Sequence, residues 1–393
     1  MDTSRLANYV LQEKQHRTVP GWLNEGAMSA VIAFAGWQHR NNVHGDVAEI
    51  GVHHGKFFIL LANLRRRHEH AFAIDIFDDQ HLNVDKSGQG DLPKFMENLR
   101  RYSSESGVTV LKKDSKALTR GNFYSGRRGN IRLFSIDGSH TATHTCSDLR
   151  LAAQLIGSDG LIILDDFFNP DWPGVQEGLY RYLRDPHCDT APFAYGNNKV
   201  FLCKGGSHAK YLSFVEDDLR PFFLHYKRVE IGGFPVVHMS LPGSESVFDS
   251  DFHLIPNVFP LHGPHVSPRI EFGAGWAELQ SNGVWTQGPC SELSLKLSTQ
   301  SPEPVTLSLA VQPFLHLRRT SRRLSVTLND CSIGEFTLDQ RTPKCLRIPL
   351  PAGVMHSECN LRFEIEEPDR PSETIGTKDS RPLGFFFRQI QIC

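Results

Sequence analysis

Acidic side chains stand at the ends of four successive apolar runs in the first half of the sequence. They are Asp75, Asp114, Asp137 and the adjacent pair Asp165 and Asp166. If these runs are parallel strands of one sheet, their carboxyl ends share the edge where ligands bind. Neighbouring strands lie about 4.8 Å apart, so acids at their ends can converge on one ion. Carboxylates with open water positions suit a hard cation, and we expect Mg²⁺ or Mn²⁺ on Asp137, Asp165 and Asp166. For any single acid, capping of the following turn is the alternative.

A histidine accompanies the predicted metal ligands. His140 follows Asp137 by three residues, and an imidazole with an unperturbed pKa of about 6.5 suits a general base at neutral pH. His140 and His144 are spaced as a zinc pair on a helix would be, but no further nitrogen or sulfur ligand follows at a usual spacing. The sequence therefore predicts His140 and Asp137 as catalytic residues.

A glycine turn between a strand and a helix forms a second candidate site. Val47–Ile50 is typical of a buried strand, Gly51 and Gly55 bracket a turn, and Lys56–Arg65 is typical of a helix with one apolar face. Glycines let a ligand approach the backbone, and a helix start offers unpaired N–H groups. Asp75, at the end of the next strand, suits a ribose diol. The spacing lacks the G-x-G-x-x-G fingerprint, which disfavours a nicotinamide dehydrogenase. A strand-turn-helix corner without a ligand is the bland alternative.

Alternating strands and helices would position these residues. The pattern predicts a doubly wound, Rossmann-like α/β sheet. Predicted strands cover 47–50, 71–75, 108–111, 131–136, 160–164 and 199–203, with a strand pair in 227–239; predicted helices cover 22–41, 56–65, 93–102, 147–155, 174–183 and 211–223.

The last third of the sequence has a different character. Residues 246–268 are rich in Pro, Gly, Ser and His, which is typical of a linker. After Arg269, short alternating runs separated by turn signals predict an all-β sandwich. We therefore expect a first domain at 1–245, a linker at 246–268 and a β-sandwich at 269–393.

Composition narrows the classes of function. The 393 residues carry a net charge of −2, which gives no electrostatic reason to expect nucleic acid as a partner. The eight cysteines are scattered, without a Cys-x-x-Cys pair, as in reduced cytosolic proteins. No signal peptide or membrane span is indicated, so we expect a soluble, cytoplasmic protein. Association into a homo-oligomer stays open.

Two motifs carry a family resemblance. The turn from Glu49 to Gly55 resembles motif I of the class I S-adenosylmethionine-dependent methyltransferases. The segment Ile136-Asp-Gly-Ser-His140, then Asp148, then the strand end at Asp165-Asp166, resembles the signature of metal-dependent O-methyltransferases. Within these it is similar to methyltransferase family 24 and the macrocin-type sugar methyltransferases, over roughly a domain-sized span.

The resemblance implies roles for individual residues. Asp137, Asp165 and Asp166 would bind the metal, and His140 would take the proton of the acceptor hydroxyl. The departures from the family pattern are His53 and His54, which occupy the motif I loop. The cofactor would contact Glu49, Gly51, Gly55, Asp75, Asp114, Ser115 and Asp137.

The implied activity is methyl transfer to a sugar hydroxyl of a bacterial surface glycan or its precursor. Segments of the last domain, such as Val326–Asp330, resemble a sandwich domain found beside bacterial glycosyltransferases. Whether that domain binds glycan or serves packing and dimerisation stays open, because a fold does not fix a function. The alternatives are methylation of a small phenol or macrolide, and a non-catalytic glycan-binding module.

Overall fold

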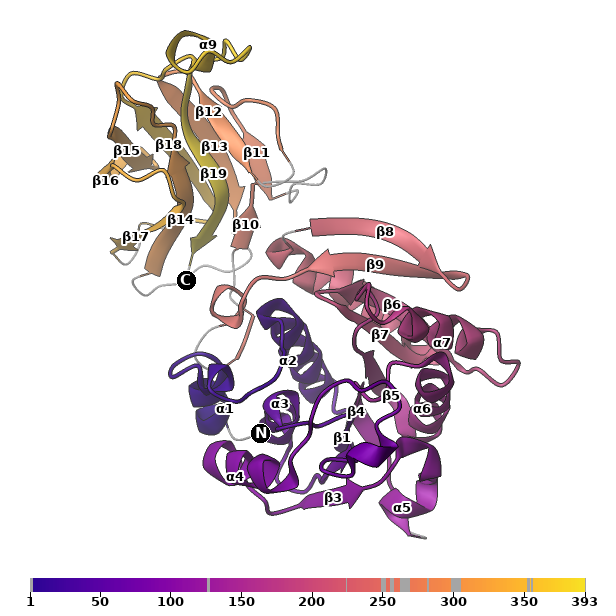
Figure 1. Ribbon diagram of the computed structural model, residues 1–393. Helices are drawn as coiled ribbons and strands as arrows, with labels where there is room; N and C mark the ends of the chain where they lie inside the picture. Colours follow the sequence, from indigo (N-terminus) through magenta and orange to yellow (C-terminus); the bar gives the residue numbers. More distant parts are fainter. Residues whose placement is uncertain are drawn as a thin grey trace. The chain divides into compact units, whose positions relative to one another are not determined.

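The computed structural model describes residues 3–125, 128–223, 225–248, 252–254, 258–261, 269–280, 283–297, 305–351, 354 and 356–392. The chain divides into two compact units, Met1–Leu254 and Ile255–Cys393 (Figure 1). The predicted linker, 246–268, spans this division and lies partly outside the described residues. One strand inside that range, β10 (Val258–Pro260), pairs with the last strand of the second unit.

The first unit is built on a nine-stranded sheet in the order β3-β2-β1-β4-β5-β7-β6-β9-β8, with helices on both faces (Figure 1). The strands from β3 to β5 are parallel. The central ones are buried along nearly their whole length, as expected for strands covered on both faces. The predicted Rossmann-like sheet is confirmed. The strands are β1 (Asp46–Ile50), β2 (Ala71–Asp75), β3 (Val108–Lys112), β4 (Ile131–Ile136), β5 (Ile156–Leu164), β6 (Thr190–Gly196), β7 (Lys199–Lys204), β8 (His225–Ile231) and β9 (Phe234–Ser240).

The helices begin and end where capping residues allow. The side chain of Asn24 accepts hydrogen bonds from the backbone N–H groups of Gly26 and Ala27, so α2 begins at Glu25 and not at Trp22 as predicted. No helix of the described residues is long and apolar enough to cross a membrane. The helices of this unit are α1 (Thr3–Val10), α2 (Glu25–Arg40), α3 (Lys56–Leu64), α4 (Leu92–Tyr102), α5 (Arg120–Tyr124), α6 (Ala142–Leu155), α7 (Pro173–Leu183) and α8 (His208–Phe214).

The hairpin of β6 and β7 was only half predicted, since β6 did not stand out in the sequence. Pro192 within β6 lacks a backbone N–H, which weakens the strand pattern. Asn197 and Asn198 turn the hairpin with φ angles of 49° and 72°, a left-handed conformation that asparagine tolerates. Because β7 runs antiparallel to β5, the hairpin brings Lys199 to the same edge of the sheet as Asp165.

The second unit consists of two antiparallel sheets that share one hydrophobic core. One sheet contains β10, β19, β14 and β17, with β12 paired to β19, and the other has the order β11-β13-β18-β15-β16. Buried and exposed residues alternate along β18, as in a strand with one face in the core. The predicted β-sandwich is confirmed. Its strands are β11 (Ile270–Phe272), β12 (Val284–Gln287), β13 (Cys290–Lys296), β14 (Val305–Pro313), β15 (Arg322–Leu328), β16 (Cys331–Leu338), β17 (Lys344–Leu350), β18 (Glu358–Ile365) and β19 (Leu383–Ile392), with the short helix α9 (Pro371–Thr374).

Candidate active site

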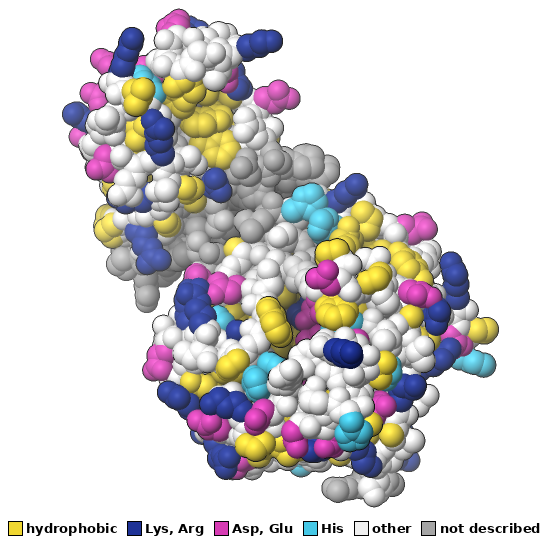
Figure 2. All heavy atoms as spheres, in the orientation of Figure 1, with side chains coloured by type: hydrophobic (Ala, Val, Ile, Leu, Met, Phe, Trp, Pro, Cys, Tyr) yellow, Lys and Arg dark blue, Asp and Glu magenta, His cyan; other side chains and the backbone are white. Residues whose placement is uncertain are grey.

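A cavity of about 580 Å³ opens at the carboxyl ends of the parallel strands of the first unit. Its volume is that of a small-molecule site, and its position is where open α/β sheets bind ligands. Figure 2 shows this face of the unit, with hydrophobic, histidine and acidic side chains around a hollow. Except for Gly55, every site residue proposed from the sequence lines the cavity: Glu49, Gly51, Asp75, Asp114, Ser115, Asp137, His140, Asp165 and Asp166.

The fold itself requires glycine at both positions of the turn. Gly51 and Gly55 have positive φ angles of 87° and 93°. A Cβ on Gly51 would lie 1.7 Å from the carbonyl oxygen of Asp137, and one on Gly55 would lie 2.8 Å from the ring of Phe95. The first glycine therefore lets the ends of β1 and β4 come together, and the second lets α4 pack against the turn. Glycine at these positions therefore permits close packing of the chain, in addition to the ligand access expected from the sequence.

The carboxylate of Asp75 holds the glycine turn in place. Its Oδ2 accepts a hydrogen bond of 2.7 Å from the backbone N–H of His53, and its Oδ1 accepts one of 2.5 Å from that of Phe77. Burial raises the pKa of the Asp75 carboxyl, against the effect of these backbone donors. Each carboxylate oxygen has a second lone pair, so Asp75 can still accept hydrogen bonds from a ribose diol. Burial lowers the pKa of His53 to about 4, so its ring is neutral beside the cavity.

The remaining cofactor candidates supply open polar groups. Glu49 is buried, and among the residues that the structure describes no group donates a hydrogen bond to its Oε2. A buried carboxylate oxygen that borders a cavity fits a ligand that brings a positive charge or an N–H group. The carboxylate of Asp114 accepts a hydrogen bond of 2.9 Å from the backbone N–H of Lys116 and so fixes the short turn that contains the buried Ser115.

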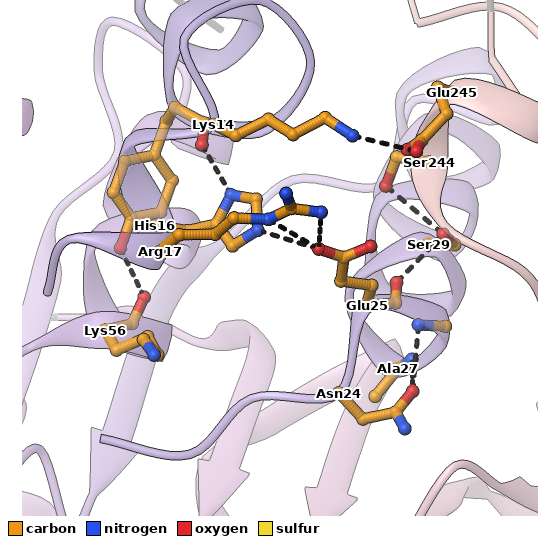
Figure 3. A network of polar contacts seen from close by, with 12 residues as sticks. Lys14, His16, Arg17, Asn24, Glu25, Ala27, Ser29, Lys56, Ser244 and Glu245 are labelled. Carbon is orange, nitrogen blue, oxygen red and sulfur yellow. Dashed lines mark hydrogen bonds and ion pairs between the residues drawn. The ribbon is translucent and has the colours of Figure 1, made fainter. Parts of the chain in front are cut away.

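The N-terminal segment lines one side of the cavity with residues 20–24. Lys56, at the start of α3, donates from Nζ to the carbonyl oxygen of Gly21 at 2.6 Å, and its own carbonyl oxygen accepts from the hydroxyl of Tyr9 at 2.6 Å. Arg17 and Glu25 form an ion pair at 2.6 Å in the same network (Figure 3). These contacts attach the segment to α2 and α3, so this wall of the cavity is fixed by the folded chain.

Towards β4 and β5, two strand-end acids lie close to the predicted base. Ligand atoms of Asp137, His140 and Asp166 all lie within 4.8 Å of one another. His140 Nε2 is 3.1 Å from Asp166 Oδ2 and 3.7 Å from Asp137 Oδ1. Asn169 and Asn198 donate to Asp166 Oδ1 at 3.0 and 2.7 Å, which leaves Oδ2 directed at the histidine. Two of the three predicted metal ligands therefore lie together.

The third predicted ligand, Asp165, has a different partner. Its carboxylate is bonded to the ammonium group of Lys199, whose side chain is only 3% exposed. The ammonium lies 4.7 Å from the centroid of the Phe57 ring. Burial lowers the pKa of Lys199, but the negative charges of Asp165, Asp137 and Glu49 outweigh it and raise the pKa. Lys199 is therefore charged at neutral pH, and its ammonium group occupies the carboxylate of Asp165.

Three carboxylates and one aromatic ring surround the imidazole of His140. Trp172 stacks on it with centroids 4.4 Å apart and planes 18° from parallel. Asp85, which the sequence did not indicate, lies 2.8 Å from its Nδ1. Burial lowers the pKa of His140, but the hydrogen bonds with Asp137, Asp166 and Asp85 outweigh this and raise it to about 11. The unperturbed value expected from the sequence is therefore corrected: while all three carboxylates are charged, His140 carries a proton at neutral pH.

Asp85 and Lys199 are two charged site residues that sequence reasoning missed. Asp85 lies in an irregular segment 55 residues from His140, where no periodicity marks it. Lys199 had one usable signal, since a lysine at the start of an otherwise apolar strand must find a partner if it is buried.

The comparisons with known proteins concern the first unit. Residues 48–167 match the model of methyltransferase family 24, described as a methyltransferase domain. No curated protein matches the chain by sequence.

Solved structures with a similar chain include three methyltransferases. The O-methyltransferase NovP is 15% identical, with 51% of this chain and 97% of that chain covered and a TM-score of 0.41. CalS11, a TDP-rhamnose 3′-O-methyltransferase of calicheamicin biosynthesis, is 17% identical, with 52% and 93% covered and a TM-score of 0.35. The Podospora anserina methyltransferase PaMTH1, bound to S-adenosylhomocysteine, is 11% identical, with 51% and 87% covered and a TM-score of 0.35. No residue role follows from similarities at this level.

The family match spans the glycine turn, Asp75, Asp137 and His140, and it ends just after Asp166. It therefore covers the part of the sheet whose strand ends form the cavity. The first unit contains a class I, S-adenosylmethionine-dependent methyltransferase domain, and the class of enzyme predicted from the sequence is confirmed.

Proposed function

We propose that the protein transfers the methyl group of S-adenosylmethionine to a hydroxyl oxygen of a sugar, in a bacterial surface glycan or its precursor. One observation carries the proposal: a single cavity is lined by the glycine turn and Asp75 towards the β2 end of the parallel strands and by His140 with two acids towards the β5 end. A cofactor bound at the first end would present its methyl group towards a proton acceptor at the second.

The cofactor-binding groups are those of the glycine turn and the next two strand ends. Asp75 would accept hydrogen bonds from the ribose, and the open oxygen of Glu49 suits the cationic methionine end. Asp114 and Ser115 line the cavity on the far side of Asp75 in the sheet and would border the adenine.

The reaction forms an oxygen–carbon bond as the sulfur–carbon bond of the cofactor breaks, which leaves S-adenosylhomocysteine. When the charge of the flanking carboxylates is balanced and His140 is neutral, the acceptor hydroxyl would lose its proton to Nε2 of His140. Asp137 and Asp166 flank that nitrogen and would position the hydroxyl. Positioning of the two reactants in one enclosed site supplies much of the acceleration in such a transfer.

A divalent cation fits the acidic end of the cavity. Asp137 and Asp166 would hold it with their facing carboxylate oxygens, and Asp165 would join them only by releasing Lys199. When bound, Mg²⁺ or Mn²⁺ would orient a sugar diol and lower the pKa of its hydroxyl. His140 could then be neutral, because the charge of the flanking carboxylates would be balanced.

The acceptor end carries the groups that suit a sugar. The ring of Trp172 offers an apolar face, and the amides of Asn169 and Asn198 offer polar groups. Such a mixture fits the apolar faces and hydroxyls of a hexose, whereas a phenol or a macrolide needs fewer polar partners. The cysteines that the structure describes are free thiols, which supports the proposed location in the cytoplasm.

The test is transfer of labelled methyl from S-adenosylmethionine to a panel of thymidine- and uridine-diphosphate hexoses, with catechol as a phenol. We expect label in a hexose, lost with EDTA and restored by Mg²⁺ or Mn²⁺. Label only in catechol would overturn the acceptor class. Activity unchanged by EDTA would remove the cation and leave the acids as positioning groups.

A further inference from the structure

A carboxylate that does not belong to a strand end is hydrogen-bonded to His140. Asp85 lies between β2 and α4, and its Oδ2 accepts a hydrogen bond of 2.6 Å from the backbone N–H of His140. The same oxygen lies 2.8 Å from Nδ1 of the ring. One carboxylate oxygen therefore fixes both the backbone and the side chain of this histidine.

Asp85 is itself held rigidly. Its Oδ1 accepts hydrogen bonds from the backbone N–H and the hydroxyl of Ser87, at 3.0 and 2.7 Å. Its side chain is only 8% exposed. The carboxylate thus uses one oxygen for its own segment and the other for His140, so its direction does not depend on solvent.

This contact decides which ring nitrogen faces the cavity. An ionised carboxylate accepts only, so Nδ1 of His140 must carry a proton to bond it. Nε2 then points to the side of Asp137 and Asp166, and the stacked ring of Trp172 opposes rotation of the imidazole. A carboxylate behind a histidine sets the tautomer and the orientation of the ring in many enzymes.

The segment that carries Asp85 also forms a wall of the cavity. Leu82 and Val84 line it, and these residues are 37% and 61% exposed. Exposed apolar side chains next to a reaction centre are suited to being covered by a ligand. The same short segment therefore contacts the acceptor space with its apolar side chains and the proton acceptor with its carboxylate.

We propose that Asp85 is the positioning residue of the acceptor end, which holds His140 with Nδ1 protonated and Nε2 towards the hydroxyl that is methylated. The role rests on the proposed function, in which His140 takes the proton. Because Leu82 and Val84 lie on the same segment, an acceptor with an apolar face against them would steady Asp85 and so the base.

The test compares Asp85→Ala and Asp85→Asn with wild type and with Asp79→Asn. Asp79 lies in the same segment but pairs with Lys112 and is 41% exposed. Nitrogen-15 NMR of the histidine side chains reports the Nδ1 proton, and His140→Gln identifies its signal. We expect the hydrogen-bonded Nδ1 proton of His140 in wild type and Asp79→Asn, and its loss in Asp85→Ala.

With the hexose that the labelled-methyl panel identifies, kcat should fall about 10- to 100-fold in Asp85→Ala, while the affinity for S-adenosylhomocysteine stays within twofold. Asp85→Asn keeps one acceptor oxygen and should be intermediate.

Several results would overturn the proposal. One is a His140 signal that is the same in Asp85→Ala as in wild type, and another is a changed signal with unchanged kcat. Equal loss of cofactor affinity and kcat in both Asp85 variants would assign the residue a purely structural role. If wild type methylates nothing in the panel, the proposed function fails, but the NMR comparison still decides whether Asp85 holds the ring.

Discussion

The two ends of the cavity are built in different ways. Most of the cofactor end comes from one stretch of the sequence: Gly51 directly follows β1, and Asp75, at the end of β2, accepts a hydrogen bond from the backbone N–H of His53. The acceptor end joins groups from distant segments, with Asp85, His140 and Lys199 more than 50 residues apart from one another. A cofactor site can therefore be encoded by local motifs, while the acceptor site depends on the tertiary fold.

The sharpest way to separate the two ends is to remove Asp75. Asp75→Ala deletes the proposed ribose partner and the acceptor of the His53 N–H group, so we expect S-adenosylhomocysteine binding to be lost in calorimetry. The exposed Asp78, three residues on and paired with Lys112, serves as the control, since Asp78→Ala should bind as wild type. Unchanged affinity in Asp75→Ala would remove Asp75 from the cofactor site.

Removal of His140 should leave the cofactor end intact. We expect His140→Ala to bind S-adenosylhomocysteine with wild-type affinity and to lose about 10²- to 10⁴-fold in kcat, the usual contribution of a general base. His81→Ala, at an exposed histidine of the segment between β2 and α4, should keep wild-type turnover. Wild-type kcat in His140→Ala would place the base elsewhere.

These differences explain what the sequence could and could not predict. The order of strands and helices follows from hydrophobic periodicity, and the glycine turn and four acidic strand ends follow from local pattern. The directions of two adjacent acids do not: the chain turns at Asp166 with a φ angle of 57°, so Asp165 meets Lys199 while Asp166 meets His140. No local sequence pattern predicts which of the two acids pairs with the buried Lys199. Asp85 was missed for the same reason, because its contact depends on the path of an irregular segment.

Lys199 is buried at the acceptor end, and its removal should lower the free energy of unfolding. Lys199→Met keeps the length of the side chain but leaves Asp165 as an uncompensated buried charge. We expect this to lower the free energy of unfolding, measured in urea, by about 3–5 kcal/mol. At the other end of β7, Lys204 is an accessible lysine paired with Asp189, and Lys204→Met should cost less than about 1 kcal/mol. Restoration of stability by Asp165→Asn in the Lys199→Met background would confirm the pairing, and equal costs for the two lysines would contradict it.

Asp148 offers a comparison that depends on pH. It lies in α6 and is fully buried, and burial raises the pKa of its carboxyl to about 7. Between the ordinary pKa near 4 and about 7 the folded state binds the extra proton, so this group's contribution to stability falls as pH rises through that window. Asp148→Asn removes the effect. Its stability relative to wild type, measured with EDTA present, should rise by up to about 4 kcal/mol from pH 4 to pH 8. A difference that is flat with pH would contradict the raised pKa.

The smallest effect is expected from removing the second unit. All residues that line the cavity belong to the first unit, so residues 1–254 should fold alone and bind S-adenosylhomocysteine as the full chain does. Calorimetry and thermal melting of this fragment check the proposed division of the chain into domains. An unfolded fragment would show that the first unit depends on the second, whereas normal affinity with a raised KM for a long glycan would favour a glycan-binding role for the sandwich.

A crystal structure with bound S-adenosylhomocysteine would show whether one cavity joins the cofactor end to the acceptor end. We expect the ribose on the carboxylate of Asp75, the adenine beside Asp114 and Ser115, and the sulfur on the side of His140. A cofactor product bound elsewhere on the first unit, or bound here with its ribose away from Asp75, would show that the proposed cofactor end is wrong.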